Sequence, residues 1–301
     1  MTRRREVETH LQTLGEIREI MAAMKNLSFM ETRKLSAFIE AQQQAVQSIE
    51  RAGADFLHFY HDFTPVPKSG PMIFVIVGSE RGFCGDYNEA LIERVIMHCQ
   101  KLQCQPFWLP VGSKLGEKLA EDSRVITSLA GAAVAEEVPP VLQQVVETLD
   151  QLERTKQIAG VSAIYHTVDE IRRTSLLPPF QSLEVPPPEK AGPPFLYLPP
   201  QQFLTELTDH YLFAALHALF YSALLAEHQR RIQHLEGALK RLDEQTEKLK
   251  IQRNILRQEE ITEEIEQILL SAQAVATELA VKKHRGNCQW PHGWSSSGMG
   301  E

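Results

Sequence analysis

The chain has 301 residues, 43% of them hydrophobic, and a formal net charge of −8 at neutral pH. Acidic and basic residues are interspersed, so no concentrated basic surface for phosphates is expected and nucleic acid is excluded as a partner. The four cysteines form no CxxC pair and no metal-binding spacing, which favours free thiols inside a cell. No apolar run approaches the roughly 18 residues of a membrane span, so any membrane association is expected to depend on partners.

The first long helix is predicted over residues 1–64, a stretch without proline. An interior proline costs a helix about 3 kcal/mol, so proline-free stretches are where long helices can form. Apolar residues recur here in two rows at heptad spacing: Val7, Leu14, Met21 and Leu35, and beside them Ile17, Met24 and Phe38. Such a double row is typical of a helix that packs along another helix in a coiled coil.

The middle of the chain, residues 70–200, alternates between predicted strands and helices. The predicted strands are Met72–Val77, Pro106–Val111, Arg124–Thr127 and Val161–Tyr165, and the predicted helices are Tyr87–Gln103, Lys114–Ala120 and Val138–Lys156. This alternation predicts a Rossmann-like α/β domain with a mainly parallel sheet. The proline-rich residues 178–200 are expected to form an irregular connection.

A second, longer helix is predicted over residues 201–281. Its apolar seam consists of Leu235, Leu242, Leu249 and Leu256, followed after a phase change by Ile261, Ile265, Ile268, Ala272, Val275 and Leu279. Acids stand four residues before bases in three pairs that we expect on the exposed face: Glu227–Arg231, Glu236–Lys240 and Glu244–Lys248. The predicted fold class is α/β, with a long antiparallel coiled coil of the terminal helices and the Rossmann-like domain inserted between them.

Residues 282–301 are predicted to form a flexible tail. The tail region contains His284, Cys288 and His292, but their spacing matches no standard metal site, and the serine run that follows favours disorder. We therefore predict no metal site there.

The glycine-rich loop GSERGFCG, residues 78–85, follows the first predicted strand. It fits neither the GxxxxGK[ST] phosphate loop nor the GxGxxG dinucleotide turn, so it is weak evidence for nucleotide binding. A nucleophilic Cys84 would need a histidine base, and none of the 11 histidines is singled out. The simpler interpretation is that Gly78, Gly82 and Gly85 turn the chain into a helix and that Cys84 is a small packed residue.

Two motifs resemble the gamma subunit of F-type ATP synthases. Residues 81–88, RGFCGDYN, resemble the family signature RGLCGxxN, through Arg81, Gly82, Cys84, Gly85 and Asn88. The family's closing pattern NxxRQxxITxExxxIxxxAxAV is matched by Asn254, Arg257, Gln258, Ile261, Thr262, Glu264, Ile268, Ala272, Ala274 and Val275. Lesser matches are Gln12, Ile17, Met21, the run Gly112-Ser113-Lys114, Glu227 and Arg231, so that the resemblance covers about residues 3 to 275.

The resemblance implies a rotor without catalytic residues, cofactor or metal. It implies as partners the alpha and beta subunits of the catalytic ring, the epsilon subunit and the membrane c-ring, at the cytoplasmic face of a bacterial membrane. By the same resemblance Arg257, Gln258 and Thr262 engage a beta loop, with Asn254 and Glu264 in support and Met21 in some beta contact beside seam packing. Residues 81–88 are then structural.

The sequence also departs from the family pattern. Lys25 is the only basic residue where the family has a basic cluster near residues 25 to 31, and the chain continues past Val275, which indicates a divergent branch. Two other interpretations stay open at this stage: a coiled-coil scaffold with an α/β module, and an enzyme that uses the loop Gly78–Gly85.

Overall fold

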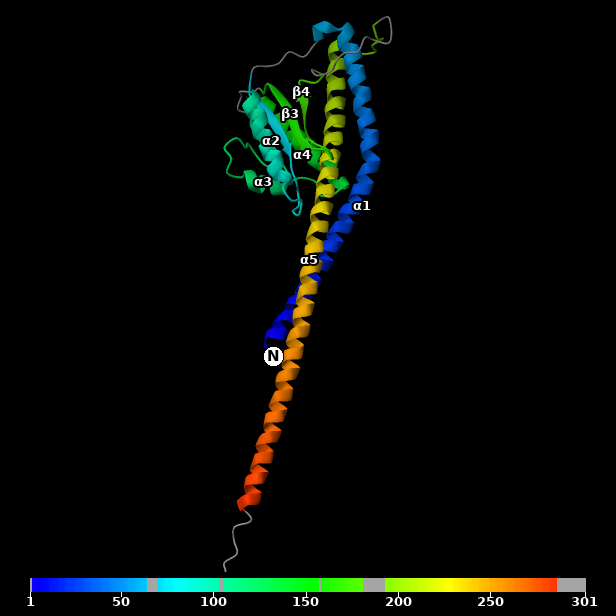
Figure 1. Ribbon diagram of the computed structural model, residues 1–301. Helices are drawn as coiled ribbons and strands as arrows, with labels where there is room; N and C mark the ends of the chain where they lie inside the picture. The colour runs from blue at the N-terminus through cyan, green and yellow to red at the C-terminus, as the bar shows by residue number, and fades with distance from the viewer. Residues whose placement is uncertain (1, 64–69, 103–105, 157, 181–192, 286–301) are drawn as a thin grey trace, which may run out of the picture. The chain divides into compact units, whose positions relative to one another are not determined.

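The two proline-free stretches form the two longest helices of the computed structural model, α1 (Thr2–Phe59) and α5 (Pro200–Arg285) (Figure 1). The structure describes residues 2–63, 70–102, 106–156, 158–180 and 193–285. Pro200 is the first residue of α5, a position where a missing N–H removes no helical hydrogen bond. The prediction of a long helix at each end of the chain is confirmed.

The chain divides into two units: a terminal unit of residues 1–18 and 241–301, and a central unit of residues 19–240. In the terminal unit, Nε of Arg4 lies 2.7 Å from a carboxylate oxygen of Glu260. Nε of Arg18 lies at the same distance, 2.7 Å, from Asp243. As the residue number increases along α1, the residue number of the facing position in α5 decreases. The two helices are therefore antiparallel there, as predicted.

The central unit shows the same antiparallel pairing of α1 with α5. Nζ of Lys25 lies 3.5 Å from Glu236, and the rings of Phe38 and Tyr221 stack at 6.1 Å between centroids. Glu236 was expected to pair along its own helix with Lys240, but its carboxylate faces α1 instead. The predicted seam is present, because Leu235 is fully buried here.

In the terminal unit the burial of the apolar seam residues of α5 decreases along the helix. Leu242 is buried, and Leu249 and Leu256 are half-buried. Beyond Glu260, which faces Arg4 near the start of α1, the apolar side chains are exposed: Ile261 by 47%, Ile265 by 52%, Ile268 by 65% and Val275 by 57%. The predicted continuation of the coiled coil after the phase change is therefore wrong for the described residues, because α1 faces α5 there only as far as the contact of Arg4 with Glu260.

A four-stranded sheet in the order β2-β1-β3-β4 forms the middle of the central unit. Its strands are β1 (Met72–Val77), β2 (Phe107–Val111), β3 (Gly160–His166) and β4 (Ile171–Leu177). β1 is parallel to both β2 and β3, which confirms three predicted strands, and β4 is antiparallel to β3. The sequence prediction missed β4, because this edge strand carries the charged pair Arg172 and Arg173 in place of an apolar run.

The fourth predicted strand, Arg124–Thr127, is not a regular strand. The chain from Val125 to Leu129 pairs with β2 through two isolated parallel bridges, Trp108 with Val125 and Val111 with Leu129. Arg124 folds its guanidinium over the Trp108 ring, 3.7 Å from the centroid, and holds Asp122 in an ion pair. These local contacts replace a continuous ladder at the edge of the sheet.

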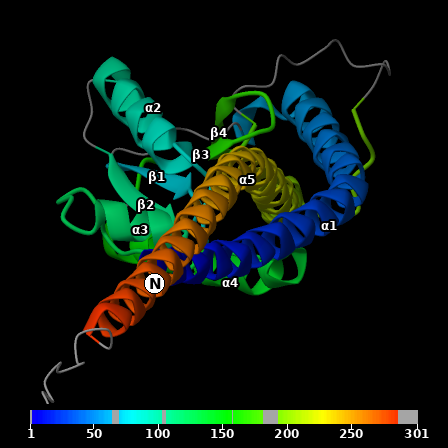
Figure 2. The same cartoon turned by 60° about the horizontal axis from the view of Figure 1, so that its bottom comes forward.

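Helices cover both faces of the sheet (Figures 1 and 2). α2 (Tyr87–Leu102) and α3 (Ser113–Leu119) pack on the face that presents Phe74, Ile76 and Ile164. The short 3-10 turn Ala135–Glu137 leads into α4 (Val138–Lys156), which packs with α1 and α5 on the opposite face. α4 coincides with its predicted range, and its two prolines lie in the first turn, where they are tolerated.

The division into 1–64, 70–200, 201–281 and 282–301 stays a sequence prediction. Cys288 and His292 lie outside the described residues. Within the described ranges, no group of three or more histidine, cysteine, aspartate or glutamate residues is placed to hold a metal ion. In the same ranges, no helix has both the length and the apolarity needed to cross a membrane.

Candidate functional site

The turn after β1 is built by tight packing around Gly78, Ser79 and Asn88. The Ser79 N–H donates to Oδ1 of Asn88 at 3.0 Å, and Nδ2 of Asn88 donates to Oγ of Ser79 at 2.8 Å. A Cβ on Gly78 would lie 2.5 Å from Cβ of Leu115, so only glycine fits between the turn and α3. Asn88 of the RGFCGDYN motif is thus a buried brace of this turn.

Two residues with positive φ reverse the chain before α2. Phe83 has φ of 65° and Gly85 has φ of 64°, in the left-handed region that glycine adopts readily. Between them, Cys84 is buried, and its Sγ donates to the carbonyl oxygens of Arg81 and Gly82 at 3.5 Å. The interpretation of this loop as a turn into a helix is supported by this geometry.

Burial raises the pKa of the Cys84 thiol to about 12. The thiolate is the nucleophilic form, and with this pKa about one molecule in ten thousand carries it at pH 8. Catalytic cysteines have a lowered pKa and an accessible sulfur. The environment of Cys84 therefore opposes the alternative of a cysteine enzyme.

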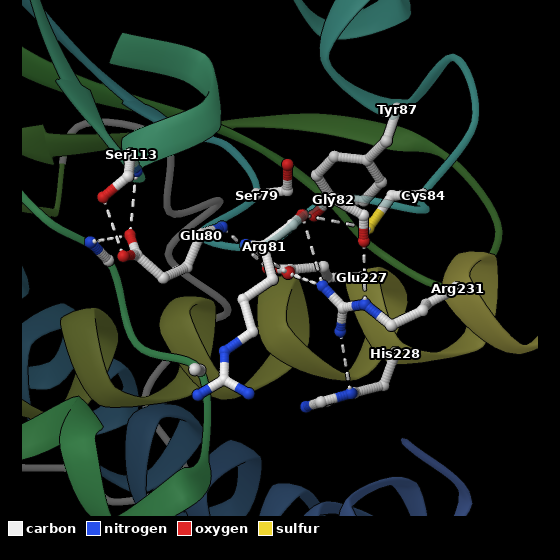
Figure 3. A network of polar contacts seen from close by, with 12 residues as sticks. Ser79, Glu80, Arg81, Gly82, Cys84, Tyr87, Ser113, Glu227, His228 and Arg231 are labelled. Atoms are coloured by element: carbon white, nitrogen blue, oxygen red, sulfur yellow. Dashed lines mark hydrogen bonds and ion pairs between the residues drawn. The ribbon is translucent and has the colours of Figure 1, made fainter. Parts of the chain in front are cut away.

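Glu227 and Arg231 of α5 hold the backbone of the loop from below (Figure 3). The Glu227 carboxylate accepts the N–H groups of Glu80 and Arg81, each at 3.4 Å, and pairs with the Arg231 guanidinium. Nε of Arg231 donates to the carbonyl oxygen of Gly82 at 3.1 Å. We call the Glu227–Arg231 ion pair, together with the backbone groups of residues 80–82 that are bonded to it, the loop latch.

The loop latch is buried, and the prediction of an exposed Glu227–Arg231 pair is wrong. The side chains of Glu227 and Arg231 are only 3% and 4% exposed. Spacing of four residues predicts the pairing, but it cannot tell an exposed helix face from one that a distant loop covers. Burial raises the pKa of Glu227, while Arg231 and the two backbone N–H groups act in the opposite direction.

Glu80 ties the loop to two other turns of the sheet, a role that the sequence analysis missed (Figure 3). Its carboxylate accepts the N–H of Ser113 at 2.8 Å, the Oγ of Ser113 at 2.7 Å and the N–H of Gly131 at 2.6 Å. Ser113 belongs to the run Gly112-Ser113-Lys114, which resembles the family pattern. The glutamate inside the glycine-rich loop was the available signal, since a carboxylate there can bond the N–H groups of neighbouring turns.

Tyr87 joins the loop to α5 and to the end of β3. Its hydroxyl donates to the carbonyl oxygen of Ala223 at 3.0 Å, and its ring stacks on His166 at 4.0 Å between centroids. Nε2 of His166 donates to the carbonyl oxygen of Tyr87 at 2.8 Å. The loop is therefore fastened at both ends to the helix that carries the latch.

His228 makes the latch sensitive to acid. Its Nδ1 accepts a hydrogen bond from Arg231 at 3.1 Å, and burial with the nearby Arg231 charge lowers its pKa to about 4. Because an unfolded histidine has a pKa near 6.5, the unfolded chain takes up a proton first as the pH falls. The stability that neutral His228 contributes is present above pH 6.5 and is lost between about pH 6.5 and 4.

We expect His228→Gln to flatten the pH dependence of stability across that window. One proton taken up on unfolding lowers the unfolding free energy by about 1.4 kcal/mol per pH unit. Urea unfolding of the wild-type chain and of the variant, at several pH values from 7 to 4.5, measures the difference between their free energies of unfolding. The opposite contribution of Glu227 is present in both proteins and cancels in this difference. His10→Gln, at an exposed position, is the control. Equal slopes for wild type and His228→Gln would show that folding does not lower the pKa of His228.

The predicted coupling residues lie on α5 in the terminal unit. All five side chains are exposed: Asn254, Arg257, Gln258, Thr262 and Glu264. Asn254, Gln258 and Thr262 follow one another at four-residue spacing and share a helix face. The hydroxyl of Thr262 donates to the carbonyl oxygen of Gln258 at 2.9 Å, which leaves its lone pairs for a donor from outside. Met21 is half-buried on α1 in the central unit.

The architecture and the buried loop together define the class of protein. Two long antiparallel helices carry an inserted α/β unit, and the loop with the most suggestive sequence is a buried structural fastening. A family model described as ATP synthase matches residues 3–275. This chain belongs to the ATP synthase gamma-chain family.

Relatives and solved structures agree with this assignment. The ATP synthase gamma chain of Clostridium botulinum (strain Langeland) is 23% identical over 279 residues, covering 89% of this chain and 96% of the relative. The gamma chain of Buchnera aphidicola subsp. Diuraphis noxia is 22% identical over 295 residues, covering 91% and 98%. A chain in the cryo-EM structure of the Euglena gracilis mitochondrial ATP synthase (OSCP/F1/c-ring, rotational state 3) has a TM-score of 0.59 at 16% identity, covering 98% of this chain and 99% of that one. At this identity the last comparison supports the fold.

Proposed function

We propose that this chain is the central-stalk rotor of a bacterial F-type ATP synthase or ATPase. In this role it transmits torque between a membrane ring of c subunits and the catalytic beta subunits. Its partners are the alpha and beta subunits of the catalytic ring, the epsilon subunit and the c-ring. It is a peripheral subunit at the cytoplasmic face of the membrane, held there by these partners.

The observation that carries the proposal is the exposed apolar run of α5. From Ile261 to Val275 the large apolar side chains are about half exposed or more. A contiguous apolar surface of this kind marks a site of contact with another protein. Among residues 265–275 only Glu266 is charged, so a surrounding apolar sleeve can turn against this segment without breaking fixed ion pairs.

The chain does no chemistry in this role. The catalytic sites belong to the beta subunits, and we assign no cofactor to this chain. The buried thiol of Cys84 and the closed hydrogen bonding of the loop favour a structural part for residues 81–88. The scaffold alternative lacks a comparable observation, since it does not account for an apolar stretch of α5 that no described residue of the chain covers.

Coupling to the beta subunits is assigned to the exposed cluster on α5 at residues 254–264, which overlaps the start of the apolar run. Arg257 supplies a forked cation that can bond a carboxylate at two points, and Gln258 and Thr262 add directional hydrogen bonds. Asn254 and Glu264 support them. Met21 adds packing on α1 with some beta contact.

Co-purification tests the rotor assignment. When the alpha, beta, epsilon and c subunits of the same cell are expressed with this chain, a tag on beta is expected to recover this chain at one copy per three beta subunits. A scaffold protein would be absent from the complex or present in equal copy number. Quantitative mass spectrometry of the purified complex separates these results.

A further inference from the structure

An apolar groove lies in the central unit between α4 and the first part of α5. Its volume is about 820 Å³, and its floor includes Val161 and Leu176 of the sheet. Apolar groups of both helices line it, among them Leu142 and Leu149 of α4 and Leu212 of α5. This volume is within the range of binding sites in proteins, about 300–1,000 Å³. None of the residues that line the groove belongs to the loop latch or to the coupling residues.

Both rims of the groove carry large apolar side chains that the described part of the chain leaves exposed. Val146 on α4 is 48% exposed and Phe213 on α5 is 66% exposed. The α4 wall presents Pro139, Leu142, Val146 and Leu149 at alternating spacings of three and four residues, the pattern with which helices pack on one another. A small molecule in the floor of the groove would leave the rims exposed, whereas a helix laid along it covers both.

The charges around the groove are of one sign. The described residues that line it include Glu147, Asp150 and Glu153 on α4 and Asp209 on α5, and no lysine or arginine. Asp150 is already paired with Arg154 at 2.9 Å, whereas the Glu147 carboxylate accepts a hydrogen bond from the neutral amide of Gln143 at 2.9 Å. A cleft lined by one sign of charge attracts and orients a partner of the opposite sign.

We propose that this groove binds a basic amphipathic helix of a partner protein. The apolar face of that helix, with residues at positions i, i+3 or i+4 and i+7, enters between Val146 and Phe213. Its lysine or arginine side chains meet Glu147 and Asp209 on the two rims. This binding surface is independent of the rotor assignment, since it uses neither the apolar end of α5 nor the coupling residues.

A synthetic peptide provides the test. Fluorescence anisotropy measures binding of the purified full-length chain to a labelled helical peptide with leucines on one face and lysines on the other. Two control peptides keep the length: one disperses the same leucines around the helix, and one replaces every lysine with glutamate. We expect measurable binding of the first peptide only. Equal binding of either control peptide would overturn the proposal.

Matched substitutions locate the binding on the chain. Val146→Arg places a cation in the rim and is expected to weaken binding about tenfold, the effect of losing one well-packed anchor. Met97→Arg, at a 45% exposed position of α2, is expected to leave binding unchanged. Phe213→Ala removes an anchor without adding charge, so it replaces Val146→Arg if that variant loses its helical circular dichroism. Equal affinities for the groove variants and Met97→Arg would overturn the proposal.

Salt and self-association complete the test. The double variant Glu147→Gln/Asp209→Asn is expected to bind the basic peptide several-fold more weakly at low salt, with a smaller difference at high salt. An unchanged affinity at low salt would contradict the assigned charge pairing. Dimerisation of the chain that Val146→Arg abolishes, seen by analytical ultracentrifugation, would mean that a second copy fills the groove and would also refute the proposal.

Discussion

Replacing Arg231 with methionine is expected to lower the free energy of unfolding of the central unit by about 3–5 kcal/mol, because it leaves a buried carboxylate without its partner. Glu227 is 3% exposed, so water cannot substitute for the lost guanidinium. The carbonyl oxygen of Gly82 loses the guanidinium donor at the same time and keeps only the weak thiol donor of Cys84. Urea unfolding followed by circular dichroism measures the loss as a shift of the midpoint.

A double variant separates the charge from the packing. In Glu227→Gln/Arg231→Met neither side chain is charged, so the variant is expected to recover a large part of the stability that Arg231→Met alone loses. The control is the exposed pair of Asp150 and Arg154 on α4, whose side chains are 53% and 76% exposed. Asp150→Asn is expected to cost less than about 1 kcal/mol. If Arg231→Met costs no more than Asp150→Asn, the loop latch does not hold the loop.

The second large effect is expected at Arg257 in the assembled complex. Arg257→Ala removes the forked cation from the exposed cluster on α5, and a hydrogen bond to a charged group contributes about 1.5–3 kcal/mol. If this contact forms at only one stage of each turn, its loss is expected to reduce ATP turnover coupled to ion transport about tenfold or more. The complex should still assemble, because the exposed apolar run of α5 is unchanged.

The matched control for Arg257 is Arg241→Ala, which removes the same side chain from an exposed position of the same helix. Arg241 lies outside the pattern shared with the gamma family, so its loss should leave coupled turnover near the wild-type value. Turnover is measured as ATP hydrolysis with simultaneous ion uptake in membrane vesicles, beside subunit ratios from gels. Equal turnover in Arg257→Ala and Arg241→Ala would remove Arg257 from the coupling site.

Regular elements with strong local signals were predictable from the sequence. The helix predicted over Val138–Lys156 coincides with α4 over its full range. The apolar run Met72–Val77 likewise predicted β1, since a central parallel strand is buried on both faces. The edge strand β4 was not predicted. It pairs with β3 at the edge of the sheet, and it carries Arg172 and Arg173 in place of an apolar run.

Features that depend on distant contacts were predicted in part or not at all. Spacing of four residues identified Glu227 and Arg231 as a pair, but their burial depends on a loop more than 140 residues earlier in the chain. The link from Glu80 to Ser113 and Gly131 joins three turns that are far apart in the sequence, and a glutamate within the glycine-rich loop does not by itself identify the two turns that it contacts. The heptad rule predicted the seam up to Leu256 and failed beyond it, because a periodic pattern shows that a helix has a partner without showing whether that partner is in the same chain.

The rotor assignment is tested most directly by observing this chain turn. A complex with the catalytic ring fixed to a surface and a gold bead attached to this chain, through a cysteine placed at the exposed position of Lys118, is followed by single-molecule microscopy during ATP hydrolysis. The assignment predicts rotation in one direction, with pauses at every third of a turn, one for each beta subunit. A bead that stays still on a complex that hydrolyses ATP at the normal rate would contradict it.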